Sequence, residues 1–399
     1  MQDPRRWRAA AWRAGGALAG LARWTLAAVL IGLLCGAVGS AFHLAVDTVT
    51  EWRAAYPQLI AALPVMGLAI VALYKATGTE GLGTNDVLDA VQDGKPVKPL
   101  LLPAIFLGTV LTHLADHERR TATLCGMAAF FTALFGTPLA ATLFAMMVVN
   151  VGLVFYSSFV PALAASLVAY AVSLGLGVPP TRFAVTAPGW DLATALRVAV
   201  LGLGCAAVTL LFCHTLHLAN RLLPRFLPNP WLRAAAGGAA VLAFTLVINS
   251  TRYNGAGTDV IAQAVEQGQA LPWDFLCKIL FTAITLAAGF KGGEVVPSFY
   301  VGATFGCVAA PLLGLPAGFG AALGLAAVFC GATNTLVPSL VLAVELFGAP
   351  GLLYYAVVCG VCYALTGYAG LYSHQTFLTA KLHPEYHAEI HPHHKPPET

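Results

Sequence analysis

Long apolar runs separated by short polar stretches are the main pattern along this chain. In the N-terminal half the runs cover 24–49, 59–76, 100–114, 121–152 and 157–176. In the C-terminal half they cover 192–220, 234–248, 275–288, 296–315, 318–329, 336–347 and 352–366. A helix of about 20 apolar residues is long enough to cross the hydrocarbon core of a bilayer. The pattern therefore predicts an all-α polytopic membrane protein.

A short motif occurs once in each half. Gly81-Leu82-Gly83-Thr84 matches Gly255-Ala256-Gly257-Thr258, and each is followed by a short amphipathic helix and an apolar run with a T-x-x-T pair. Further along, Thr137 mirrors Thr335. Repeated halves with Gly-interrupted segments are typical of transporters whose binding site lies where the repeats meet.

This repeat divides the chain. We place a basic N-terminus at 1–23, the first membrane repeat at 24–178 and the second at 192–370. A C-terminal helix is predicted over 371–382, followed by a His-rich tail over 383–399, which we expect to be disordered and not to bind metal.

The halves differ near 115–121. In the second half, Cys330 lies 45 positions after Thr285. In the first half, Cys125 lies only 13 positions after Thr112, so about 30 residues are missing from the first half. The polar run Asp116–Arg120 does not replace them, because consecutive strongly polar positions predict a loop and not a membrane-buried helix start.

The partner of the missing stretch, Gly289–Ser298, interrupts two apolar runs with three glycines, Lys291 and Glu294. The next helix should start at about Val295, with the positive end of its dipole facing the gap. A broken helix of this kind holds anions in membrane proteins. A short extramembrane loop with a capping Glu is the alternative, and this stretch alone does not decide between them.

Composition and charge exclude the soluble classes. The 399 residues are 58% hydrophobic and only 10% charged, with a mean hydropathy of +0.76, whereas soluble domains carry about 25% charged residues. We therefore expect no nucleic-acid partner. Five arginines precede the first run, which predicts a cytoplasmic N-terminus: Arg5, Arg6, Arg8, Arg13 and Arg23.

Over residues 24–382 the motifs resemble the CLC family of anion channels and anion/proton exchangers, in particular its bacterial fluoride-selective branch. The most specific are Gly292-Gly293-Glu294-Val295-Val296-Pro297, Phe135-Gly136-Thr137-Pro138-Leu139-Ala140, Cys330-Gly331-Ala332-Thr333-Asn334-Thr335 and Gly370-Leu371-Tyr372-Ser373. The resemblance implies a homodimer in the bacterial inner membrane. Each subunit would have two inverted repeats with broken helices that meet at a midplane anion site.

The resemblance also implies the residues of that site. Tyr372 would present its hydroxyl to the anion, and the amides of Gly292, Gly293, Glu294, Val295 and Val296 would face the same ion. Leu82, Gly83 and Thr84 match the loop in which chloride-type members carry a serine, here Leu82. Glu294 is a fluoride-branch feature and the candidate for gating or proton transfer. Since burial disfavours a charged carboxylate, we expect it to carry a proton or to swing aside.

Two departures bear on mechanism. The family's gating glutamate lies in a Gly-Arg-Glu-Gly turn that this chain lacks, and Met147 stands where the family usually has a Glu. Glu345, the internal counterpart of Met147, is equally compatible with a structural and a functional role. Thr137 and Thr335 are supporting candidates, and we interpret both as helix caps in preference to ligands.

We therefore predict membrane transport of small halide ions, with fluoride favoured over chloride, through a CLC-type pore that is uncoupled or impaired. Protons are a further candidate partner. The alternative is a transport-inactive homologue that acts as a structural or dimerising subunit. The chain has no H-E-x-x-H or G-x-S-x-G pattern, and we expect neither enzymatic activity nor a cofactor or metal.

Overall fold

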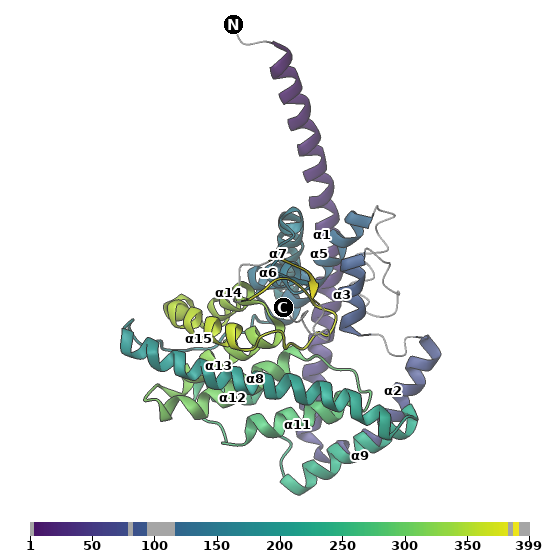
Figure 1. Cartoon of the computed structure of the whole chain (residues 1–399). Helices are drawn as coiled ribbons and strands as arrows, with labels where there is room; N and C mark the ends of the chain where they lie inside the picture. Colours follow the sequence, from purple (N-terminus) through teal and green to yellow (C-terminus); the bar gives the residue numbers. More distant parts are fainter. Residues whose placement is uncertain (1–3, 79–82, 94–115, 382–385, 391–399) are drawn as a thin grey trace. The chain divides into compact units, whose positions relative to one another are not determined.

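A computed structural model describes residues 4–78, 83–93, 116–381 and 386–390. Helices dominate these residues (Figure 1). Six of them are long and apolar enough to cross a membrane, namely Ala22–Ala55, Pro57–Thr77, Tyr156–Gly175, Leu192–Phe226, Pro230–Ile248 and Val295–Leu312. The all-α polytopic architecture is thus confirmed. The predicted span at 100–114 lies outside the described residues.

The N-terminal elements, in chain order, are α1 (Pro4–Ala55), the 3-10 helix η1 (Pro57–Ala62), α2 (Leu63–Thr77), α3 (Thr84–Asp93), α5 (Asp116–Phe135), α6 (Pro138–Met147), β1 (Asn150–Val151), η2 (Tyr156–Ser158) and α7 (Phe159–Gly175). The C-terminal elements are α8 (Leu192–Phe226), α9 (Pro230–Ile248), α10 (Thr258–Glu266), α11 (Asp274–Ala287), α12 (Val295–Leu312), α13 (Ala317–Thr333), α14 (Leu336–Phe347), η3 (Ala349–Gly351), α15 (Leu352–Leu365), β2 (Thr376–Thr379) and β3 (Tyr386–Ile390).

The chain forms two compact units. Unit 1 comprises Met1–Leu44, Asp89–Met146 and Phe155–Pro180, and unit 2 comprises Ala45–Leu88, Met147–Val154 and Thr181–Thr399. These units do not follow the predicted repeat boundaries, because part of the first repeat packs into unit 2. The division into repeats at 24–178 and 192–370 stays a prediction.

In unit 1, α5 and α7 pack together, and α1 lies against α7. Gly36 allows that approach, since a Cβ there would lie 2.9 Å from Cα of Ala169. Arg120, in the first turn of α5, donates from Nε to the Val91 carbonyl at 2.6 Å and from Nη2 to the Gln92 carbonyl at 2.5 Å. These carbonyls belong to the last turn of α3, where a cation is favourable.

In unit 2, α8 runs beside α11, α13 and α15 (Figure 1). Helices α12 and α13 are in the closest contact, through glycines that face each other. A Cβ on Gly306 would lie 2.0 Å from the Gly320 carbonyl, and one on Gly302 would lie 2.3 Å from the Gly324 carbonyl. Small residues four apart let helix backbones approach in membranes.

Three sequence expectations are wrong. Residues 116–120 form the first turn of α5 and not a loop, because Arg120 holds them against α3. Of the segment 371–382, residues 371–381 are not a helix but a turn followed by β2, which pairs in parallel with β1 and antiparallel with β3. Finally, residues 386–390 of the expected disordered tail form β3. The 121–152 run is also broken, at Gly136, whose φ of +68° ends α5.

Candidate functional site

The turn between α11 and α12 has the predicted form. Helix α12 begins at Val295, and Glu294 occupies its N-cap position without a side-chain capping bond, so its carboxyl does not cap the helix, while the position of the loop relative to the membrane stays a prediction. Gly289, with φ of +99°, redirects the chain after α11. A Cβ on Gly293 would meet no heavy atom within 4 Å. The backbone amides at the start of α12 are therefore approachable by a small ion.

Charge at this turn comes from Lys291 and Glu294. Lys291 is exposed, and Glu294 is half-buried. Glu294 precedes α12 and lies outside the candidate spans. Burial raises the pKa of its carboxyl to about 7, and the Lys291 ammonium opposes that rise. The raised pKa favours the neutral form of the carboxyl compared with an ordinary glutamate.

The start of α3 lies next to this turn within unit 2. Nζ of Lys291 is 3.9 Å from the position that a Cβ on Gly83 would occupy. The Gly83 amide donates to Oδ2 of Asp86 at 2.6 Å, and Nδ2 of Asn85 donates to Oγ of Ser373 at 2.9 Å. Thr84 is the exposed first residue of α3, whereas Leu82 lies outside the described residues.

Tyr372 follows α15 in the turn that Asn85 reaches. Its side chain is only 5% exposed. Burial and the nearby Glu294 carboxylate hold the pKa of Tyr372 well above its usual range, so the hydroxyl stays protonated and can donate to an anion. The structure thus brings Tyr372, Glu294 and the Gly83–Asp86 segment to one place in unit 2.

A polar cluster that consists of buried Asn334 and Gln375 and half-buried Lys381 lies beside the Tyr372 turn. Asn334 has φ of +57° and donates from Nδ2 to Oε1 of Gln375 at 2.9 Å. Gln375 donates from Nε2 to the Thr333 carbonyl at 2.9 Å. Lys381 donates to Oδ1 of Asn334 and lies over the ring of Tyr363. Sequence reasoning missed these three side chains, although Asn334 stands out as a polar residue within a quoted motif.

Thr137 and Thr335, two of the supporting candidates, make no side-chain capping bond in the described part of the chain. Thr335 occupies the N-cap position of α14 but makes no side-chain capping bond, and its hydroxyl lies 2.6 Å from that of Thr333. Thr137, in unit 1, is fully buried, and its hydroxyl has no hydrogen-bond partner within the described part of the chain. The capping interpretation of both side chains is therefore wrong. Glu345 is half-buried within α14.

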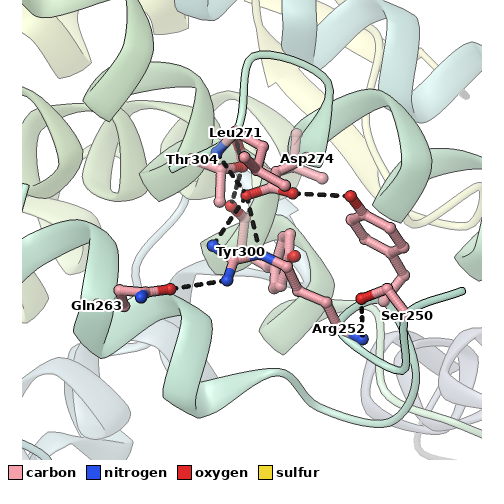
Figure 2. Close-up of polar contacts among 9 residues, drawn as sticks. Ser250, Arg252, Gln263, Leu271, Asp274, Tyr300 and Thr304 are labelled. Atoms are coloured by element: carbon pink, nitrogen blue, oxygen red, sulfur yellow. Dashed lines mark hydrogen bonds and ion pairs between the residues drawn. The ribbon is translucent and has the colours of Figure 1, made fainter. Parts of the chain in front are cut away.

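A second polar cluster, which sequence reasoning also missed, surrounds Asp274 at the start of α11 (Figure 2). Asp274 is fully buried and forms an ion pair with Arg252, with an Nη2–Oδ2 distance of 3.0 Å. Its other oxygen accepts from the Tyr253 hydroxyl at 2.9 Å. Arg252 also donates to Gln263 at 2.7 Å, beside an open cavity of about 490 Å³. These bonds join the segments before and after α10 to the start of α11.

Comparison with known proteins gives consistent results. A sequence model of the family described as "Voltage gated chloride channel" matches residues 103–367. A "Chloride/fluoride channel protein" of Pseudomonas syringae pv. tomato is 34% identical over 400 residues, which cover 91% of this chain and 88% of the relative. The "Voltage-gated ClC-type chloride channel ClcB" of Escherichia coli is 27% identical over 259 residues, which cover 59% and 60% of the two chains.

Solved structures agree in fold. The chain is similar to a "CLC-type fluoride/proton antiporter" with a TM-score of 0.83 and 31% identity, covering 90% of this chain and 98% of that one. It is similar to a "slow cyanobacterial Cl-/H+ antiporter" with a TM-score of 0.71 and 15% identity, covering 86% and 94%. The second likeness shows the fold alone.

Proposed function

This chain belongs to the voltage gated chloride channel family, the CLC family of anion channels and antiporters, and we propose from that premise that it transports fluoride across a membrane. Chloride is the alternative ion. The observation that carries the proposal is the convergence of Tyr372, the start of α12 and the Gly83–Asp86 segment in unit 2.

The chemistry of the three segments suits a small anion. Fluoride is strongly hydrated, so its site has to replace water with several short hydrogen bonds. The Tyr372 hydroxyl and the amides from Gly292 to Val296 are donors, and the start of α12 adds the positive end of a helix dipole. The Leu82 position, which carries no hydroxyl, supports fluoride over chloride in the light of the family pattern. Thr84 adds a hydroxyl nearby.

We propose that this transport is uncoupled from protons or coupled only weakly. Alternating exchange requires a carboxylate that both carries the proton and blocks the anion. The first-half turn that supplies it in the family is missing near 115–121, and Met147 replaces an internal carboxylate. Glu294 remains as the candidate carboxylate.

The test is fluoride and chloride efflux from proteoliposomes, read with ion-selective electrodes together with a proton-flux signal. We expect fluoride efflux with little proton movement. Glu294→Gln and Tyr372→Phe should each change fluoride efflux several-fold, because each alters a polar group of the proposed site. The matched controls are Glu266→Gln, on an exposed residue of α10, and Tyr368→Phe, at a ring that packs on Phe377.

Two results would contradict the proposed fluoride transport. If folded wild-type protein releases neither ion, the transport proposal is wrong and a structural, transport-inactive role takes its place. If both site variants behave like their controls, the ion does not use this site.

The protein is an integral membrane protein with several spans, and we propose that it is a homodimer in a bacterial inner membrane. The family resemblance supports both proposals. Native mass spectrometry of detergent-purified protein would report the mass of the assembly directly.

A further inference from the structure

Lys291 has a defined place at the candidate site, although no motif assigned it a role. Its Nζ lies 3.9 Å from the Cβ position at Gly83 and 5.7 Å from the ring centroid of Tyr74. The ammonium thus lies between the end of α2, the start of α3 and the Gly292–Glu294 turn. A lysine on an exposed turn usually has many rotamers. The proximity of Nζ to Gly83 and to the Tyr74 ring selects a rotamer of Lys291 that points toward these two segments.

The two carboxylates near Lys291 differ in their hydrogen bonding. The ammonium is within electrostatic range of two carboxylates, Asp86 and Glu294. Asp86 already accepts a 2.6 Å hydrogen bond from the Gly83 amide, whereas Glu294 does not cap its helix. Cys213 of α8 and Tyr372 are also within electrostatic range of Glu294. Lys291 is therefore the cation that acts on Glu294 within this group.

We propose that Lys291 recruits the anion to the Gly292–Val296 turn and controls when the neighbouring Glu294 carboxylate repels it. This inference rests on the proposed function and adds a positioning residue to the same site. The exposed ammonium attracts a diffusing halide ion toward the start of α12. A neutral Glu294 adds no negative charge beside the ammonium, whereas an ionised Glu294 weakens the attraction.

The proposal fixes the sign of the pH dependence. Below its pKa, the Glu294 carboxyl is neutral, so fluoride binds and passes; above that pH, the carboxylate opposes fluoride and efflux falls. Lys291 stabilises the ionised Glu294 carboxylate, and the decrease in fluoride efflux therefore occurs at a lower pH than it would without the ammonium. Removal of the ammonium should raise the pKa of Glu294 and move the fall in efflux to higher pH.

The experiment compares wild type with Lys291→Met, Lys291→Arg and Lys75→Met. Lys75 is a matched control, because it is an exposed lysine of unit 2 whose ammonium lies 5.4 Å from a ring centroid, that of Trp231. Fluoride efflux would be measured in proteoliposomes between pH 5.5 and 8.5 at low and high ionic strength. Fluoride binding to purified protein would be titrated separately by ¹⁹F NMR.

We expect Lys291→Met to raise the half-saturating fluoride concentration about tenfold at low ionic strength, with a smaller effect at high salt. Its pH profile should move to higher pH. Lys291→Arg should restore both properties, because the guanidinium keeps the charge, and Lys75→Met should match wild type. A purely structural lysine would reduce the amount of folded protein without moving the pH profile.

The readouts separate this inference from the proposed function. If wild type transports and Lys291→Met keeps both its pH profile and its half-saturating concentration, the inference is wrong and the function stands. If wild type does not transport, the function fails, and weaker ¹⁹F-detected binding in Lys291→Met alone still supports the inference. Equal binding by all variants overturns it.

Discussion

At the scale of single residues, the unusual positions are polar groups placed in apolar surroundings. Glu294 occupies an N-cap position without capping, and Tyr372 is a buried donor within its electrostatic range. Asp274 is different, because its carboxylate accepts bonds from Arg252, Tyr253 and the Leu271 amide. A fully satisfied buried carboxylate stabilises a fold, whereas a carboxyl without such partners is free to change its protonation state.

Asp274 therefore provides a stability prediction. Asp274→Ala should lower the free energy of unfolding by about 3 kcal/mol, because it leaves Arg252 and the Tyr253 hydroxyl without their acceptor. The measurement is the thermal midpoint of purified protein in detergent. Glu266→Ala, at an exposed acid of α10, is the control and should leave the midpoint unchanged. Equal midpoints for the two variants would contradict the structural role.

At the scale of elements, the contact between α12 and α13 positions the site. The start of α12 carries the amides of the proposed site, and the end of α13 leads into Asn334, whose side chain bonds to Gln375 beside the Tyr372 turn. Glycines on both helices, Gly302 and Gly306 against Gly320 and Gly324, bring the two backbones together. A change in that spacing moves the donors on α12 and the Tyr372 turn relative to one another.

Gly306→Ala tests this packing. A Cβ at Gly306 would lie 2.0 Å from a backbone carbonyl, so the helices have to separate, at a cost of about 1–3 kcal/mol. We expect a lower thermal midpoint and weaker fluoride binding. Gly360→Ala in α15 is the control, since its Cβ would meet nothing within 4 Å and alanine favours the helix. If both substitutions give the same thermal midpoint and the same fluoride binding, the close contact between α12 and α13 does not contribute to stability or to the site.

At the scale of the whole molecule, the charges near the N-terminus predict the orientation in the membrane. The arginines at positions 5, 6, 8, 13 and 23 precede the first span. The positive-inside tendency predicts that this end lies in the cytoplasm.

A reporter fused to the N-terminus tests this orientation. Green fluorescent protein should fluoresce there, and alkaline phosphatase should be inactive, because the latter folds only outside the cytoplasm. The reverse pair of results would mean that the whole topology is inverted. Replacement of the five arginines by glutamine should reduce the bias toward the cytoplasm.

The sequence by itself determined the features that depend on local order. Apolar runs of sufficient length predicted the membrane helices, and the glycines before Val295 predicted the start of α12, because hydrophobic period and turn chemistry act over a few residues. The order of the motifs indicated the family without any knowledge of contacts.

Only the tertiary structure decided which polar groups meet. Arg252 and Asp274 are 22 positions apart, and Asn334 and Gln375 are 41 apart, so no local pattern pairs them. The start of α5 was mispredicted for the same reason, since the polar run 116–120 becomes helical where Arg120 reaches the carbonyls of α3. Tyr372 likewise lies in a turn and not in a helix, because Asn334, Gln375 and the pairing of β1 with β2 hold that segment. Hydrogen-bond partners distant in sequence can override local preference, and only the folded chain reveals them.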